Sequence, residues 1–174
     1  MSKTNNFIFN GLHIVAWVIF VGLCIEAGGF ILSLYKPEFI QNLYNKLDLN
    51  EMYNRNKWAF FSMYSFMLVI AVLKAVLFYV VIRLVSNIDL GKPFNRFVSR
   101  QFLQISYYTF AIVLLSYIAR QSAKFLVHRG FVADSLNQFW ADSQAFILMA
   151  AVLYVIAVIF KKGIEIQNEN DLTV

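Results

Sequence analysis

The stretch WAFFSMYSFMLVIAVLKAVLFYVVIRLV, residues 58–85, decides the fold, because only Lys74 and Arg83 carry a charge within it. A helix needs about 20 apolar residues to cross a hydrocarbon layer about 30 Å thick, and this run exceeds that length. Three further apolar runs lie at about residues 11–34, 102–127 and 144–160. No segment alternates with the period of two that the strands of a membrane barrel require. The sequence therefore predicts an all-α, polytopic membrane protein with four transmembrane helices in an antiparallel bundle.

The composition agrees with a single membrane domain covering residues 1–174. Of the 174 residues, 60% are hydrophobic and 14% are charged, and one soluble core of this size does not hide so much apolar surface. The first run is too long for the apolar part of a signal peptide, so we expect it to be retained. Cys24 is the only cysteine, which excludes an intrachain disulfide and a cysteine-based zinc site.

The basic residues give the expected orientation only indirectly. Apart from Lys74, they divide evenly, seven to each side, so counting alone does not orient the chain. Lys161 and Lys162 follow the fourth span directly, where basic residues have most weight, whereas Arg120 and Lys124 belong to the end of the third helix. We therefore expect both termini, the middle loop and a tail at residues 161–174 to be cytoplasmic.

Two loops contain amphipathic helical patterns. In the first outer loop, apolar residues recur at helical spacing over about residues 38–47, which predicts a short helix that lies on the outer membrane surface or caps the bundle. In the middle loop, SNIDLGKPFNRFVSRQF, Arg96 and Arg100 share one face of a helix that runs into the third span. These arginines are placed to meet anionic lipid or, alternatively, the acidic face of a partner.

Three ionisable residues are the candidates for an interaction inside the membrane. Charged groups at this depth are costly, by about 2.5–3.5 kcal/mol each, and they usually face a partner within the protein. At about 1.5 Å per residue, Glu26 and Lys74 stand at similar heights, roughly 22 and 18 Å from the inner ends of their spans. We predict an intramembrane ion pair between Glu26 and Lys74 that fixes helix register, with Arg120 as a competing partner. A proton or ion pathway is the functional alternative.

Two motifs carry a resemblance to a known family. DLGKPF, residues 89–94, follows the second span, and KKGIEIQNENDLTV, residues 161–174, ends the chain. With four spans at this spacing, the sequence resembles the domain of unknown function 2975 family of small bacterial membrane proteins. In that family the middle loop has an Asn-Pro-Phe-like turn, occupied here by Lys92, Pro93 and Phe94, so Lys92 replaces the usual Asn. The family's acidic tail is matched by Asp171, Leu172, Thr173 and Val174.

The resemblance implies a regulatory role, because members of the family are often encoded beside a small helix-turn-helix regulator. It implies location in the bacterial cytoplasmic (inner) membrane, and it names no reaction. The leading hypothesis is a non-enzymatic protein that contacts a cytosolic helix-turn-helix transcription regulator through the middle loop and the tail. It has no direct nucleic-acid partner and no cofactor, since no His or Cys stands at metal-ligand spacing from His13.

Two other hypotheses remain open. One is an accessory structural subunit of a larger membrane assembly, with integral membrane partners or further copies of this chain. The other is a small four-helix membrane enzyme or an ion-coupled transporter. In the enzyme, Arg120, Lys124 and His128 would form an anion site near the outer end of the third span.

Overall fold

The computed structural model describes residues 3–35, 50–88, 95–131, 136 and 143–171, and these residues contain four long helices. The long helices are α1 (Lys3–Tyr35), α4 (Lys57–Asn87), α5 (Arg96–His128) and α6 (Ser143–Asp171). A fifth helix, α3 (Asn50–Arg55), is short. All four long helices are long and apolar enough to cross a membrane, and the described residues contain no strand. The all-α prediction with four spans is confirmed.

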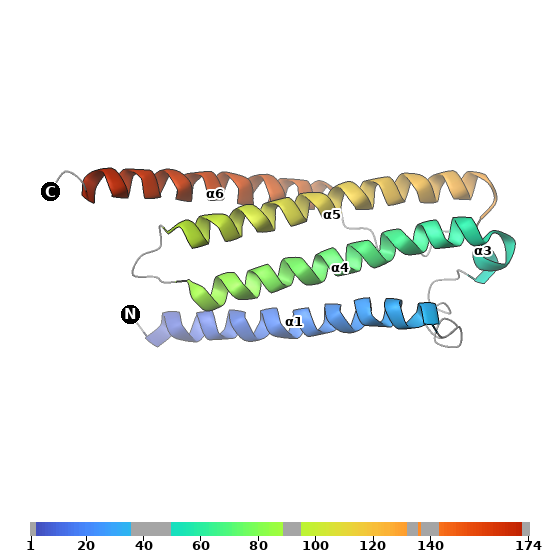
Figure 1. Ribbon diagram of the computed structural model, residues 1–174, viewed down its shortest axis with the longest axis horizontal. Coiled ribbons are helices and arrows are strands. Elements are labelled where there is room, and N and C mark those ends of the chain that lie inside the picture. The colour runs from blue at the N-terminus through green and yellow to red at the C-terminus, as the bar shows by residue number, and fades with distance from the viewer. Residues whose placement is uncertain (1–2, 36–49, 89–94, 132–135, 137–142, 172–174) are drawn as a thin grey trace.

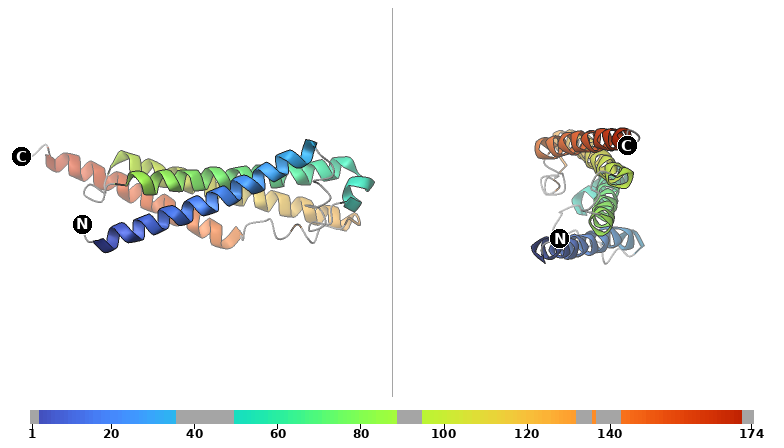
Figure 2. Two further views of the ribbon diagram at one scale, coloured as in Figure 1. Left: turned by 90° about the horizontal axis from the view of Figure 1, so that it is seen from below. Right: turned by 90° about the vertical axis from the view of Figure 1, so that its left-hand side faces the viewer.

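The four long helices lie side by side in chain order, and each runs antiparallel to the next (Figure 1). α1 packs on α4, α4 on α5, and α5 on α6, so α1 and α6 form the two edges of the row. The end-on view in Figure 2 shows that the row bends and leaves one side open between its edges. Both termini lie at the same end of the row, which we call the termini end.

Helix boundaries follow from local capping. Asn56 precedes α4, and its Oδ1 accepts from the backbone N–H groups of Trp58 and Ala59 at 3.0 and 3.4 Å. Asn95 caps α5 in the same way, accepting from Val98 N–H at 2.8 Å. These bonds satisfy backbone donors that have no partner within the first turn of a helix. At the other end of α5, Gly130 takes a φ of 80°, a conformation that glycine adopts without a Cβ penalty.

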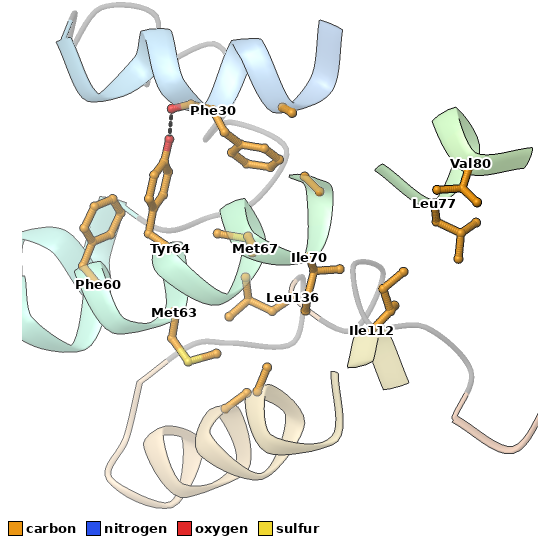
Figure 3. Close-up of a cluster of buried hydrophobic side chains, with 14 of the residues drawn as sticks. Phe30, Phe60, Met63, Tyr64, Met67, Ile70, Leu77, Val80, Ile112 and Leu136 are labelled. Atoms are coloured by element: carbon orange, nitrogen blue, oxygen red, sulfur yellow. Dashed lines mark hydrogen bonds between the residues drawn. The ribbon is translucent and has the colours of Figure 1, made fainter. Parts of the chain in front are cut away.

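The core lies between α1, α4 and α5 (Figure 3). Met63, Met67 and Ile70 form one stripe of α4, and the wholly buried Leu136 packs against this stripe from the segment between α5 and α6. On the α1 side, the Tyr64 hydroxyl donates to the backbone oxygen of Phe30. This bond gives a buried phenol its partner and fixes α1 against α4.

Small residues allow α5 and α6 to approach closely. Ala150 and Ala157 are buried, and their backbone oxygens accept from Ser106 Oγ at 2.9 Å and Ser99 Oγ at 3.2 Å. Ser99 and Ser106 are seven residues apart, and so are Ala150 and Ala157, so the same contact repeats after two helical turns. Small side chains and hydroxyl hydrogen bonds are the usual means of joining helices in a membrane, where apolar burial gives little preference for protein over lipid.

Helix α6 is displaced along the row relative to α5. Because Ser106 is level with Ala150, the first residue of α6, Ser143, is level with about residue 113, near the middle of α5. At the termini end α6 continues to Asp171 and projects beyond the other helices (Figure 1). The predicted span of about residues 144–160 is therefore the first part of a longer helix, and most of the predicted tail is helical.

Two other predictions about local structure have different outcomes. The helix expected at about residues 38–47 lies outside the described residues. The short helix α3 was missed, although its Met52 is buried. Arg55, at the end of α3, donates to the backbone oxygen of Gly130 at 2.6 Å and lies 4.6 Å from the Phe131 ring. This contact fixes α3 to the end of α5. Because the two residues are 75 positions apart, no local sequence pattern predicts it.

Candidate functional site: a basic groove between α5 and α6

The first turns of α5 and the later part of α6 form a groove of about 370 Å³ at the termini end. Arg96, Arg100 and Lys161 line it with basic side chains, and Leu103 and Ile164 supply apolar walls. Asn95 starts α5 next to this groove, so the capping bond positions both arginines. Ser99, which also lines it, is held by its bond to Ala157 of α6. The groove is therefore built on two helices that are joined directly beside it.

The charge in the groove is strongly positive. Arg96, Arg100 and Lys161 are exposed, and none of them makes a hydrogen bond or ion pair with the described part of the chain. Glu165 also lines the groove, but its carboxylate accepts from Lys162 Nζ at 2.7 Å. The one carboxylate among the lining residues is thus offset by a cation of its own helix. Three basic side chains remain available to an anion.

Sequence reasoning placed Arg96 and Arg100 correctly on the helix that enters the third span. The structure adds Lys161, which joins them only because α5 and α6 pack side by side. The other residues of the predicted contact surface lie outside the described residues, namely Lys92, Pro93 and Phe94 of the middle loop and Leu172, Thr173 and Val174 of the tail. Asp171 is the last residue of α6.

Glu26 and Lys74 lie at matching depth. Phe20 and Tyr79 are in ring contact at 6.2 Å, and these two residues define the register between α1 and α4. Glu26 lies six residues beyond Phe20, so it is level with residue 73 of α4. Glu26 is also one helical turn from the buried Phe30, and Lys74 is one helical turn from the buried Ile70. The depth comparison made from the sequence therefore agrees with the helix register.

The predicted ion pair is nevertheless not formed in the structure. Glu26 is exposed and Lys74 is half-buried, and within the described residues no ion pair joins them. The reason is rotation. α1 contacts α4 through Ala27 and Phe30, and Glu26 is about 100° from Ala27 and about 40° from Phe30 around the helix, so it lies at the edge of this contact. Matching heights do not determine in which direction a side chain points.

Arg120 is displaced from Glu26 and Lys74 along the row. The contacts of Arg83 with Phe97 and of Arg55 with Gly130 set the register of α4 and α5. By this register Arg120 is level with residues 60–65 of α4, at least nine residues from Lys74, or about 14 Å. Arg120 is half-buried, and no ion pair joins it to Glu26 in the described part of the chain. Within the described residues, Glu26, Lys74 and Arg120 therefore do not form a three-member network.

A contact that sequence reasoning missed lies on α1 and α4 at the termini end. Ser86 Oγ lies 2.8 Å from His13 Nε2, and Trp17 Nε1 donates to the same nitrogen at 3.1 Å. Ser86 Oγ also lies 2.8 Å from the backbone oxygen of Ile82, which it can donate to. Ser86 and His13 are 73 positions apart, so only the packing of α1 on α4 brings them together. Because Ser86 has a single hydroxyl proton, it donates either to Ile82 or to His13, and in the second case it joins α4 to α1.

Among the described residues, no three His, Cys, Asp or Glu side chains gather as they would around a metal ion. His128 and Lys124, named above for an anion site with Arg120, are both exposed on α5. A shallow pocket of about 470 Å³ at that end is lined by Gln121 and Ser122, with Ser62 and two apolar residues, and contains none of the three basic residues.

The helices and the basic groove define an all-α, multi-pass membrane protein. A model of the family described as a protein of unknown function (DUF2975) matches residues 44–174, and the chain belongs to this family. No curated protein and no solved structure matches it. The matched residues include the groove and all of α6 but leave out α1, so Glu26 lies outside the part that the family model describes.

Proposed function

We propose that this chain is a non-enzymatic regulatory protein of a bacterial cytoplasmic membrane and that it holds a cytosolic helix-turn-helix regulator at the membrane surface. The observation that carries this proposal is the part of α6 after Phe160, which continues as a helix to Asp171 and projects beyond the other helices (Figure 1). A projecting helix at a membrane surface offers side chains to a protein in the adjacent compartment. The termini end is the cytoplasmic end in this proposal.

The projecting part of α6 has a surface suited to a partner. Ile166 is 57% exposed, an apolar side chain outside the predicted span, with exposed Gln167 and Glu169 nearby. On the same helix Lys162 and Glu165 form the ion pair at 2.7 Å that supports a helix through side chains three residues apart. The helix is therefore formed before a partner arrives, which lowers the entropic cost of binding.

The test is co-purification of the full chain with a small helix-turn-helix regulator, chosen by sequencing the genes beside its own. We expect the chain and the regulator to elute together from mild detergent, and we expect removal of the last eight residues to separate them. Ile166→Asp should have the same effect, whereas Gln167→Ser, next to it on the helix, should not. Identical elution of the regulator with the full and shortened chains would refute docking on the tail.

An accessory subunit of a larger membrane assembly is the second candidate, and α1 gives the observation that favours it. α1 is an edge of the row, and Gly22 and Gly29 have no neighbouring atoms within 4 Å of an added Cβ. Glu26 lies between them on that helix and is exposed. Small residues around a polar side chain suit contact with another membrane helix. Co-purification with the same integral membrane proteins after loss of the tail would favour this function.

A further inference from the structure

We propose that the groove between α5 and α6 binds the phosphate of an anionic phospholipid headgroup. The site consists of Arg96 and Arg100 on α5 and Lys161 on α6, with Leu103 and Ile164 beside them. This proposal does not rest on partner docking. Lys161 and Ile164 belong to the part of α6 after Phe160, but they line the groove together with residues of α5, whereas the docking surface is the exposed face around Ile166.

The charges in the groove favour a phosphate over a neutral ligand. Arg96 and Arg100 are four residues apart and lie on one face of α5, and Lys161 completes the set from α6. A guanidinium group donates two parallel hydrogen bonds to phosphate oxygens, and an ammonium group supplies a point charge. Arg83, which is also near this end, lies 5.7 Å from the Phe97 ring, and the groove does not include it.

The carboxylate of Glu165 opposes this ligand only in part, because it interacts with Lys161 and Lys162 and the lining residues carry three positive charges against one negative. It is 2.7 Å from Lys162 Nζ, so an anion in the groove meets an ion pair instead of a free negative charge. Ser99 is also occupied, since its hydroxyl donates to Ala157. The groups left to bind a ligand are therefore the three basic side chains and Asn168, which also lines the groove.

The position of the groove favours a lipid over free phosphate. Phe102 and Phe160 are in ring contact at 5.3 Å, and each precedes a groove residue in the chain, Leu103 and Lys161. Beyond them Tyr107 and Ile159 are exposed by 58% and 56%, as side chains that face lipid tails are. Leu103, which belongs to the predicted third span, gives the groove an apolar wall where the upper part of an acyl chain would lie. Basic groups at such a position attract anionic headgroups.

The experiment titrates the full chain in neutral detergent with dihexanoyl-phosphatidylglycerol and counts bound lipid by native mass spectrometry. Dihexanoyl-phosphatidylcholine and inorganic phosphate are the parallel probes. We expect phosphatidylglycerol to bind most tightly, phosphatidylcholine to bind weakly, and inorganic phosphate to compete poorly. In the double variant Arg100→Gln/Lys161→Gln, the affinity for phosphatidylglycerol should fall about thirtyfold, or about fivefold for each charge removed.

A matched control removes two exposed lysines at the opposite end, in Lys57→Gln/Lys124→Gln, and should leave the affinity within about threefold. The variant Arg100→Lys/Lys161→Arg retains both charges and should bind phosphatidylglycerol almost as the parent does, which separates loss of the site from loss of the fold. Equal losses in the Gln variant and the matched control would overturn the groove as the site. Binding of inorganic phosphate as tight as that of phosphatidylglycerol would overturn the assignment to lipid.

Discussion

Two buried serines of α5 offer a direct test of how α6 is held. Ser106 is 4% exposed, and its Oγ donates to the backbone oxygen of Ala150 at 2.9 Å. Ser116 is 1% exposed, and its Oγ has no hydrogen-bond partner within the part of the chain that the structure describes. Both belong to the same helix, so replacing each with Ala removes one oxygen in a similar setting. The two substitutions differ mainly in whether a hydrogen bond is lost.

The expected magnitudes follow from that difference. An interhelical hydrogen bond in a membrane protein contributes about 0.6 kcal/mol on average and about 1.7 kcal/mol at most. Ala also has the higher helix propensity, by a few tenths of a kcal/mol, and this gain applies to both variants. We therefore expect Ser106→Ala to lower the free energy of unfolding by about 1 kcal/mol relative to Ser116→Ala. Ser116→Ala itself should be neutral or stabilising, because it removes a buried hydroxyl without a partner.

The assay is reversible unfolding in mixed micelles at increasing mole fraction of a denaturing detergent, followed by loss of helicity. Both variants and the parent chain are measured under the same conditions, and Ser99→Ala provides a second bonded serine with a longer contact of 3.2 Å. If Ser116→Ala destabilised the chain as much as Ser106→Ala, the hydrogen bond to Ala150 would not be what joins these helices. The reasoning from burial and bonding would then be wrong.

Three further outcomes are expected from the same unfolding assay. Glu26→Gln and Lys74→Met should be additive within about 0.5 kcal/mol, because no ion pair joins these two side chains in the structure; non-additivity above about 1 kcal/mol would show that they pair in the bilayer. Asn56→Ala should cost about 0.5–2 kcal/mol by removing the cap of α4, and Asn56→Asp, which keeps an acceptor, should restore most of it. Gly130→Ala should cost about 1–2 kcal/mol because of the positive φ of 80° there, and a neutral result would contradict that conformation.

How far the sequence predicted the site depends on whether the residues involved are close in the chain. Arg96 and Arg100 could be placed on one helix face because they are four residues apart. Lys161 could not be added to them, since it follows a different span and reaches the groove only through the packing of α5 on α6. The same limit applies to Ser86 and His13, whose contact depends on the register of two helices and not on any local pattern.

The sequence by itself determined the four spans, because the length and hydropathy of each apolar run set whether a helix can cross a bilayer, and these are local properties. It also determined the depth at which Glu26 and Lys74 lie, since the rise per residue of a helix is fixed. Only the tertiary structure decided the rotation of α1, which leaves Glu26 at the edge of the contact with α4, and the displacement of α6, which begins level with the middle of α5. Rotation and displacement depend on which side chains interlock between helices, and small residues such as Ala150 and Ala157 decide that through contacts far apart in the chain.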